Sequence, residues 1–411
     1  MPDQKLLKKY ADLIVKVGVN VQHNQPVVIR ATTENKQLVR ELTKSAYQAG
    51  AKQVFTLFSD DIVTHSTITY ATVETLTDIP DYLVAQYQHF VNIGACFISV
   101  TSPVPGLNND LDPYKLQQQA IASQQKLAFF SQHTMANKAQ WCVVAGANQT
   151  WGEAVFAGLK GDEATEKLWS AIFTACRVDL TSDPVKNWAI HNKNLSKYNQ
   201  KLNELNFKSL RFTNSLGTDL TVELIKDHVW AGGNETAGNG TIFNPNMPTE
   251  EAFTMPYKFG TQGRVYSTKP LNYQGKLIDE FYLDFKDGQV VGFDAKKEKE
   301  TLANLLNMDE GAKYIGEVAL ISHDTPISKT NIVFLNTLFD ENASCHLALG
   351  RAYPMNIKNG VKMTQDELIK LGYNHSNIHV DFMFGSSDMK IVAVKQDGSE
   401  FILFEKGNFV I

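Results

Sequence analysis

One short segment near the C-terminal end places two metal-binding side chains on the same side of a strand. The segment Asn377 to Gly385 reads N-I-H-V-D-F-M-F-G, and its apolar residues predict a β-strand. Side chains two positions apart in a strand share a face, so we expect His379 and Asp381 to lie together. An imidazole beside a carboxylate can chelate a divalent cation. A hydrogen bond from Asp381 that fixes the tautomer of His379 is the alternative.

A second candidate is a carboxylate within an apolar strand. The segment Tyr314 to Ser322 reads Y-I-G-E-V-A-L-I-S, and a period of two puts Glu317 on the face of Ile315, Ala319 and Ile321. A buried ionised carboxylate needs a compensating partner, which would be a metal ion, an arginine or a proton. The pattern therefore leaves both a structural ion pair and a metal ligand open for Glu317.

A pair of carboxylates stands between two prolines. The segment Asn246 to Pro256 reads N-M-P-T-E-E-A-F-T-M-P. The prolines make the backbone stiff and extended, so Glu250 and Glu251 should point in different directions. Taken alone, this segment is typical of a solvated loop.

A fourth segment, Cys345 to Pro354, reads C-H-L-A-L-G-R-A-Y-P and brings His346, Arg351 and Tyr353 near a glycine that permits a tight bend. Cys345 beside His346 could suggest a thiol nucleophile with its base. Adjacent side chains of an extended segment face opposite ways, which argues against that pairing.

Together the four segments offer two imidazoles and, if one glutamate of the pair is counted, three carboxylates outside any thiolate context. Five nitrogen and oxygen ligands are too many for an ordinary structural zinc site. With water they suit two cations about 3.5 to 4 Å apart, so we expect a hydrolytic metal centre.

The first half of the chain alternates helical and β-rich segments. An amphipathic helix over Leu6 to Val17 is followed by a βαβ unit and by two more strands, and a helix-rich stretch runs from about Asp162 to Glu204. The βαβ unit and later strands are Pro26 to Arg30, helix Glu34 to Gln48, Gln53 to Phe58, Ile93 to Val100 and Trp141 to Ala145. This alternation predicts a mostly parallel sheet covered by helices.

After Leu205 the pattern changes to short alternating strands joined by turn pairs such as Asp287-Gly288 and Asp397-Gly398. One helix, at about Lys296 to Met308, interrupts them. The predicted fold is an α/β N-terminal domain over residues 1–190, with a helical bridge towards its end. An α+β, β-rich C-terminal metal-binding domain follows over residues 205–411.

Composition narrows the class of protein. The chain has 411 residues, with 39 basic and 44 acidic side chains interspersed and a formal net charge of −5. A nucleic-acid or anionic-membrane partner is therefore not expected. We expect no membrane-spanning segment, because no run of 18 apolar residues occurs. Four scattered cysteines without C-x-x-C spacing fit a reducing cytoplasm.

The four segments also match a family pattern of P-T-E-E-x-F-T, G-E-x-A-L, a histidine before a tyrosine, and H-x-D-F-M. They stand in that order as Pro248 to Thr254, Gly316 to Leu320, His346 with Tyr353, and His379 to Met383. The chain resembles the thermophilic-type two-metal metallopeptidases that include aminopeptidase T and aminopeptidase S. The early strings P-V-V-I-R and A-G-A-K extend the resemblance over nearly the whole chain.

The resemblance implies a set of metal ligands, namely Glu251, Glu317, His346, His379 and Asp381. It places Tyr353 at the same centre as an oxyanion donor, and it gives Glu250 no inherited role, so Glu250 is a candidate general base. Asp388 stands where the family pattern has a glutamate.

The implied activity is hydrolysis of the N-terminal residue of short peptides through a two-metal activated water. Zinc, cobalt or manganese would serve as the two divalent ions, and the implied assembly is a homodimer. A two-metal amidohydrolase acting on a non-peptide amide is one alternative. A non-catalytic, metal-stabilised peptide-binding protein is the other.

Overall fold

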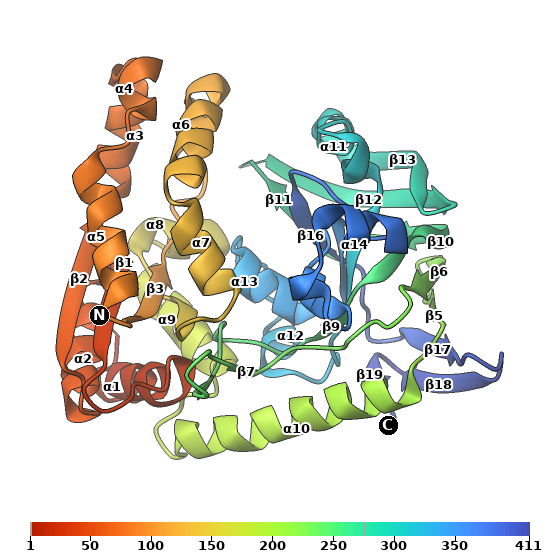
Figure 1. Cartoon of the computed structure of the whole chain (residues 1–411), viewed down its shortest axis with the longest axis horizontal. Helices are drawn as coiled ribbons and strands as arrows, with labels where there is room; N and C mark the ends of the chain where they lie inside the picture. Colours follow the sequence, from red (N-terminus) through yellow and green to blue (C-terminus); the bar gives the residue numbers. More distant parts are fainter. Residues whose placement is uncertain (1, 275) are drawn as a thin grey trace. The chain divides into compact units, whose positions relative to one another are not determined.

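The computed structural model describes residues 2–274 and 276–411. The chain divides into two compact units, coloured mainly from red to yellow and from green to blue in Figure 1. Unit 1 runs up to Ile190 and also takes in Asn234–Pro248, whereas unit 2 comprises His191–Gly233 and Thr249–Ile411. The segment 234–248, which the sequence pattern assigns to the second domain, lies in unit 1.

Unit 1 contains the expected parallel sheet. Its four strands lie in the order β2-β1-β3-β4, and every pair is parallel. The strands are β1 Pro26–Thr32, β2 Gln53–Ser59, β3 Cys96–Thr101 and β4 Trp141–Ala145. On one face Val28 and Phe97 pack against Phe90 of helix α5 (Asp81–Asn92) and Phe130 of helix α7 (Ala128–Met135). Because neighbouring strand residues face opposite ways, the fully buried Ile29 lies on the other face, so both faces are covered.

The helices of unit 1 are α1 Gln4–Leu13, α2 Lys36–Gln48, α3 Asp61–Tyr70, α4 Val73–Thr77, α5 Asp81–Asn92, α6 Pro113–Lys126, α7 Ala128–Met135, α8 Gln149–Val155 and α9 Gly161–Ala175. Helix α10, Pro184–Leu205, begins in unit 1 and ends in unit 2. A short hairpin of β7 Glu235–Thr236 and β8 Ile242–Phe243 also belongs to unit 1. Among the described residues, every helix is either too short or too polar to span a bilayer.

One strand boundary differs from the prediction. The expected strand begins at Ile93, but β3 begins at Cys96. Ile93 instead caps helix α5, donating its backbone N–H to the carbonyl of His89, and Gly94 turns the chain with φ +67°. The apolar run therefore begins on the end of a helix, which periodicity alone does not distinguish from a buried strand.

Unit 2 contains a large antiparallel sheet in the order β11-β12-β10-β6-β5-β17-β18-β19, with β13 paired to β12. Its strands are β5 Ser209–Thr213, β6 Asp219–Leu224, β10 Pro256–Tyr266, β11 Leu271–Tyr273, β12 Lys276–Lys286, β13 Gln289–Lys297, β17 Lys390–Val394, β18 Glu400–Glu405 and β19 Asn408–Phe409. The predicted turn pairs are confirmed, since Asp287-Gly288 joins β12 to β13 and Asp397-Gly398 lies between β17 and β18.

A second, four-stranded antiparallel sheet carries the chemistry. It lies in the order β16-β15-β14-β9, with β9 Ala252–Thr254, β14 Ile315–Leu320, β15 His346–Gly350 and β16 His379–Met383. One face of this sheet contributes Val318, Leu347 and Phe382 to the main apolar core of unit 2. Because side chains alternate, the other face is left for the polar residues between them.

The helices of unit 2 are more numerous than predicted. Besides α11 Lys299–Leu306 they are α12 Pro326–Thr330, α13 Thr337–Asp340 and α14 Gln365–Leu371. The helix predicted at about Lys296 to Met308 is α11, but it begins at Lys299. Lys296 and Lys297 end strand β13, where they form ion pairs with Glu280 and Asp279 on β12 at 2.8 and 3.0 Å. Cross-strand ion pairs of this kind favour a strand over a solvated helix start.

Candidate metal centre

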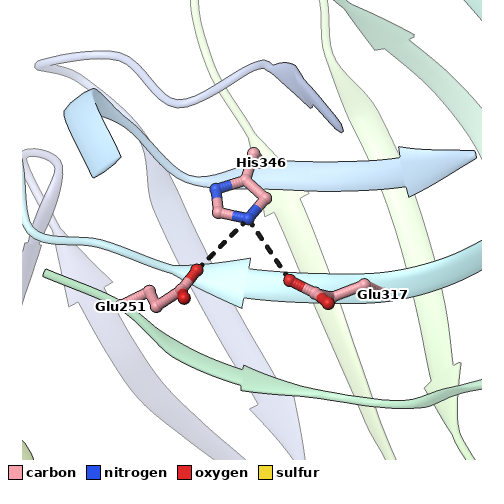
Figure 2. Close-up of side chains that lie close together, drawn as sticks. All are labelled: Glu251, Glu317 and His346. Carbon is pink, nitrogen blue, oxygen red and sulfur yellow. Dashed lines mark hydrogen bonds and ion pairs between the residues drawn. The ribbon is translucent and has the colours of Figure 1, made fainter. Parts of the chain in front are cut away.

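The five predicted ligand side chains converge on the polar face of the small sheet. His346 on β15 lies between two carboxylates, and its Nε2 atom is 3.4 Å from Oε2 of Glu251 and 3.3 Å from Oε1 of Glu317 (Figure 2). All three residues are at least nine-tenths buried. The solvated-loop interpretation of the paired glutamates is therefore wrong, because Glu251 directly precedes β9 and is buried.

A second group shares a member with the first. The Nε2 atom of His379 is 3.7 Å from Oε2 of Glu317 and 3.4 Å from Oδ1 of Asp381. The ligand atoms of Glu251, Glu317 and His346 lie within 4.8 Å of one another, and so do those of Glu317, His379 and Asp381. The predicted pairing of His379 with Asp381 on one face of a strand is confirmed, and Glu317 belongs to both groups.

Strand register explains why distant residues meet. Ala348 on β15 pairs with Glu317 on β14 and with Asp381 on β16. Directly paired residues share a face, so the small, fully buried Ala348 lies between the two carboxylates. Gly350, which pairs with His379, likewise has no side chain on this face. The small residues of β15 leave space above the sheet that the charged side chains surround.

Both imidazoles are oriented by backbone carbonyls. Nδ1 of His346 donates to the carbonyl oxygen of Glu341 at 2.8 Å, and Nδ1 of His379 donates to that of Arg351 at 2.6 Å. In the neutral ring this places the proton on Nδ1 and leaves the Nε2 lone pair for the cluster. Metal-binding histidines are commonly held in this way.

Burial and the closeness of several carboxylates shift the pKa values of the cluster. Burial first, and then the charge of Glu317, raise the pKa of Glu251 to about 8. Burial lowers the pKa values of the two imidazoles, but the neighbouring carboxylates outweigh it and raise those of His346 and His379 to about 10. Without cations, the cluster therefore retains protons near neutral pH.

Sequence reasoning missed one member of the cluster. Burial first, and then the charges of Asp381 and Glu251, raise the pKa of Glu341 well above its usual range. Glu341 follows helix α13 and belongs to no motif, and its carbonyl orients His346. Nothing in the local sequence distinguishes this glutamate from a surface residue. With Glu251, Glu317 and Asp381 it makes four carboxylates.

Tyr353 lies at the same centre. Its ring centroid is 4.6 Å from that of His379. Burial first, and then the charges of Glu317 and Asp381, raise the pKa of its hydroxyl well above the usual range. The phenol is therefore protonated at neutral pH and can donate a hydrogen bond.

Glu250 points to a different partner from Glu251, as predicted. Its Oε2 atom is 3.8 Å from Nε2 of His191, and its backbone N–H donates to Oδ1 of Asn342 at 2.7 Å. The geometry places its carboxylate beside this histidine of helix α10 and outside the two groups of metal-binding side chains.

Two other residues from the predicted segments have structural contacts. Arg351 donates from Nε to the carbonyl of Ser376 at 2.7 Å, and burial raises the pKa of the Cys345 thiol to about 12. A thiol with such a pKa is not a nucleophile near neutral pH. Asp388 accepts hydrogen bonds from the backbone of Ser215 and from Ser386, so it organises a turn at the protein surface.

The cluster fits divalent cations. Among the described residues, Oδ1 of Asp381 is a buried oxygen that accepts no well-formed hydrogen bond and lies 3.4 Å from Nε2 of His379 and 4.0 Å from Nε2 of His346. Such an atom is costly to bury unless a cation compensates it. The ligand set of carboxylate oxygens and imidazole nitrogens suits zinc, manganese and similar ions.

Comparison with known proteins gives the class to which the chain belongs. The model of a family described as thermophilic metalloprotease (M29) matches residues 3–409. The chain therefore belongs to the M29 family of thermophilic metalloproteases. Family membership together with the two groups of ligand side chains indicates the use of divalent metal.

Individual relatives match this chain over nearly its full length. Aminopeptidase 2 of Geobacillus stearothermophilus is 44% identical over 406 residues, covering 99% of this chain and 98% of its own. Aminopeptidase AmpS of Bacillus subtilis is 42% identical, covering 98% of each chain. The solved structure of wild-type AmpT from Thermus thermophilus matches with a TM-score of 0.93 at 34% identity, over 99% of this chain and 100% of that one.

Proposed function

We propose that this protein is a metal-dependent aminopeptidase whose centre binds two divalent cations that share Glu317. Its full-length relatives named aminopeptidases support the activity. The observation that carries the number of cations is that Glu317 belongs to both groups of ligand side chains. Four carboxylates around the centre also match the charge of two divalent cations.

Different side chains would bind the two cations. Glu251 and His346 would bind one cation, His379 and Asp381 the other, and Glu317 both. A cation pair supplies Lewis acidity, which activates a water molecule near neutral pH and polarises a carbonyl group. The backbone carbonyls that accept from each Nδ1 keep both imidazoles in the orientation that this requires.

Two protein groups act on the reacting peptide in this proposal. The protonated hydroxyl of Tyr353 donates to the oxygen of the scissile carbonyl as negative charge develops on it. Glu341 moves a proton from the attacking water to the leaving amine. We favour Glu341 over Glu250 for this task because Glu341 interacts with Asp381 and Glu251, whereas Glu250 lies against His191.

The proposal includes a substrate class, a compartment and an assembly. The substrates are short peptides with a free N-terminus, and zinc, cobalt and manganese all match the ligand set. The four cysteines are free and buried, which supports a reducing compartment such as the cytoplasm. The homodimer rests on the family resemblance and is tested by light scattering on the purified protein.

Metal content and substrate choice test the function together. The purified chain is loaded with zinc, cobalt or manganese, and bound metal is counted by mass spectrometry for wild type and Asp381→Ala. The same samples are given leucyl-anilide, leucyl-glycine and their N-acetylated forms. We expect two ions per wild-type chain, fewer in the variant, and cleavage only of substrates with a free amine.

A matched control is Glu223→Gln on strand β6, which removes a carboxylate of unit 2 outside the two groups. It should retain metal and activity. Equal cleavage of acetylated substrates would favour an amidohydrolase, and no cleavage with any metal would favour a binding protein. One ion per wild-type chain at saturation would refute the shared role of Glu317.

A further inference from the structure

A pocket in unit 2 directly adjoins the metal centre. Asp381 and Glu341, which belong to the cluster, form part of its lining, together with Asp340. The apolar part of the lining comes from Leu271, Leu335 and other side chains on strands β11 and β16 and on the loop before α13. A group bound at the centre therefore has an adjoining space with apolar walls.

Two of the three carboxylates that line this pocket, those of Asp381 and Asp340, are already engaged. Asp381 belongs to the cation-binding groups. Oδ1 of Asp340 accepts the backbone N–H of Phe334 at 2.7 Å, and Oδ2 accepts that of Asn336 at 3.0 Å. Asp340 thus uses its oxygens to hold the loop. The pocket offers a ligand polar and apolar surface in similar amounts, and Leu335 and Leu271 belong to the apolar part.

The loop that presents this surface is tightly fixed. Leu335 lies between the two residues whose backbone N–H groups donate to Asp340. Its φ is 57°, a conformation that a leucine rarely adopts. The rings of Phe334 and Phe339 stack with centroids 4.6 Å apart behind it. A strained conformation held by a buried carboxylate and an aromatic pair positions Leu335 and Asn336 reproducibly at the pocket.

Asn336 adds an unused donor. Its Oδ1 atom caps helix α13 by accepting the N–H of Leu338 at 3.1 Å. Its Nδ2 atom is buried, and among the described residues it has no hydrogen-bond partner. A buried donor without a partner costs free energy in the unliganded protein, and a ligand carbonyl could satisfy it. Asn336 and the apolar wall line the same pocket.

We propose that this pocket is the subsite for the side chain of the N-terminal residue, that it selects apolar side chains through Leu335, and that Asn336 hydrogen-bonds a backbone carbonyl of the peptide. The proposal rests on the proposed aminopeptidase function. In an N-terminal residue, one carbon atom joins the amine, the carbonyl and the side chain. If the first two groups are held at the cations, the side chain must enter space that touches a ligand such as Asp381.

The experiment changes the volume of the pocket and measures the ratio of kcat/KM values between substrates. Asn272→Trp fills the pocket from an exposed position on β11, and Leu335→Ala enlarges it. Values of kcat/KM are compared for glycyl, alanyl, leucyl and phenylalanyl anilides. We expect Asn272→Trp to lower the leucyl-to-glycyl ratio at least tenfold, and Leu335→Ala to raise the phenylalanyl-to-leucyl ratio by a similar factor, since one methylene changes selectivity about 10- to 200-fold.

Matched controls are Val291→Trp on β13 and Leu216→Ala, both at exposed positions outside the pocket lining. They should leave the ratios within about twofold of wild type. A general loss of structure lowers kcat/KM for all substrates by the same factor and leaves each ratio unchanged. Unchanged ratios in the two pocket variants would therefore contradict the proposal.

Asn336→Ala has a different expected readout. Because Nδ2 would contact the peptide backbone, this variant should lower kcat/KM by a similar factor for every first residue. Dipeptides varied at the second position complete the test. If Asn272→Trp changes selectivity at the second residue and not at the first, the assignment is wrong. If the wild-type protein cleaves none of these substrates, the proposed aminopeptidase function is wrong, and the subsite proposal is wrong with it.

Discussion

Oε1 of Glu317 lies 3.3 Å from Nε2 of His346, while its Oε2 lies 3.7 Å from Nε2 of His379. One carboxylate therefore faces both imidazoles, each oxygen towards one ring. This arrangement makes the two proposed cation positions interdependent, since a change at Glu317 alters both, whereas a change at Asp381 alters chiefly one.

We therefore expect Glu317→Gln to weaken the binding of both cations. Asp381→Asn should weaken the binding of one cation more than that of the other. Removing a hydrogen-bond partner of a ligand costs about 10- to 100-fold in metal affinity, so loss of the ligand charge should cost at least as much. Stepwise calorimetric titration of the metal-free protein resolves the two events. Two unaltered binding steps in Glu317→Gln would show that it is not shared.

Tyr353→Phe should separate catalysis from binding. The variant keeps the ring beside His379 and loses the hydroxyl that we propose as the donor to the developing oxyanion. Loss of one such donor typically lowers kcat about 100- to 1,000-fold. KM and metal content should change little, which steady-state kinetics and metal analysis measure on the same preparation. A variant with wild-type turnover would remove Tyr353 from the mechanism.

Glu341→Gln and Glu250→Gln form a matched pair for the proton-transfer step. If Glu341 moves the proton, its variant should lose about 100- to 10,000-fold in kcat, whereas Glu250→Gln should lose much less. The two changes are chemically identical, and they affect a buried carboxylate at Glu250 and a half-buried one at Glu341. A larger loss in Glu250→Gln would transfer the role to that residue.

Cation affinity should rise with pH. Cations must displace protons from Glu251, whose pKa is about 8, and from His346 and His379, whose pKa values are about 10. Each raised pKa means that protons compete more strongly below it, so affinity should increase from about pH 6 to about pH 9. Calorimetry in buffers of different ionisation enthalpy measures the protons released. Binding without proton release would contradict these pKa directions.

The small residue between the two carboxylates gives a further prediction. Ala348→Val adds two methyl groups where Glu317 and Asp381 flank β15, and overpacking of this size costs about 1 to 3 kcal/mol. Because the added volume enters the cation space, metal content should also fall. Ala393→Val on β17, equally buried in the large sheet, should cost stability without lowering metal content. Denaturant unfolding and metal analysis test both variants.

Local periodicity was enough to predict part of this centre. His379 and Asp381 are two apart in a strand, so their common face follows from backbone geometry alone. The apolar neighbours of Glu317 predicted its buried position, but a register shift between Ile315 and Glu317 puts Ile315 in the core with Val318 and not on the face of Glu317. The βαβ order of the first half likewise predicted a parallel sheet, which β1 and β2 form.

Other features depended on contacts that a linear pattern does not contain. Glu341 reaches the cluster from the end of a short helix, and no repeat or motif marks it. Ala348 matters only because its neighbours across the sheet are acidic, which strand register determines. The short helices α12 and α13 are four or five residues long, too short for a helical period to show.

The four-stranded sheet has a consequence for how the protein matures. Its strands are drawn from positions between Ala252 and Met383, and β16, the last of them along the chain, supplies two of the proposed ligands. A nascent chain emerging from the ribosome would therefore lack a complete centre until the residues after Asp381 had been synthesised. Acquisition of metal would then be a late event that reports completed assembly of this unit.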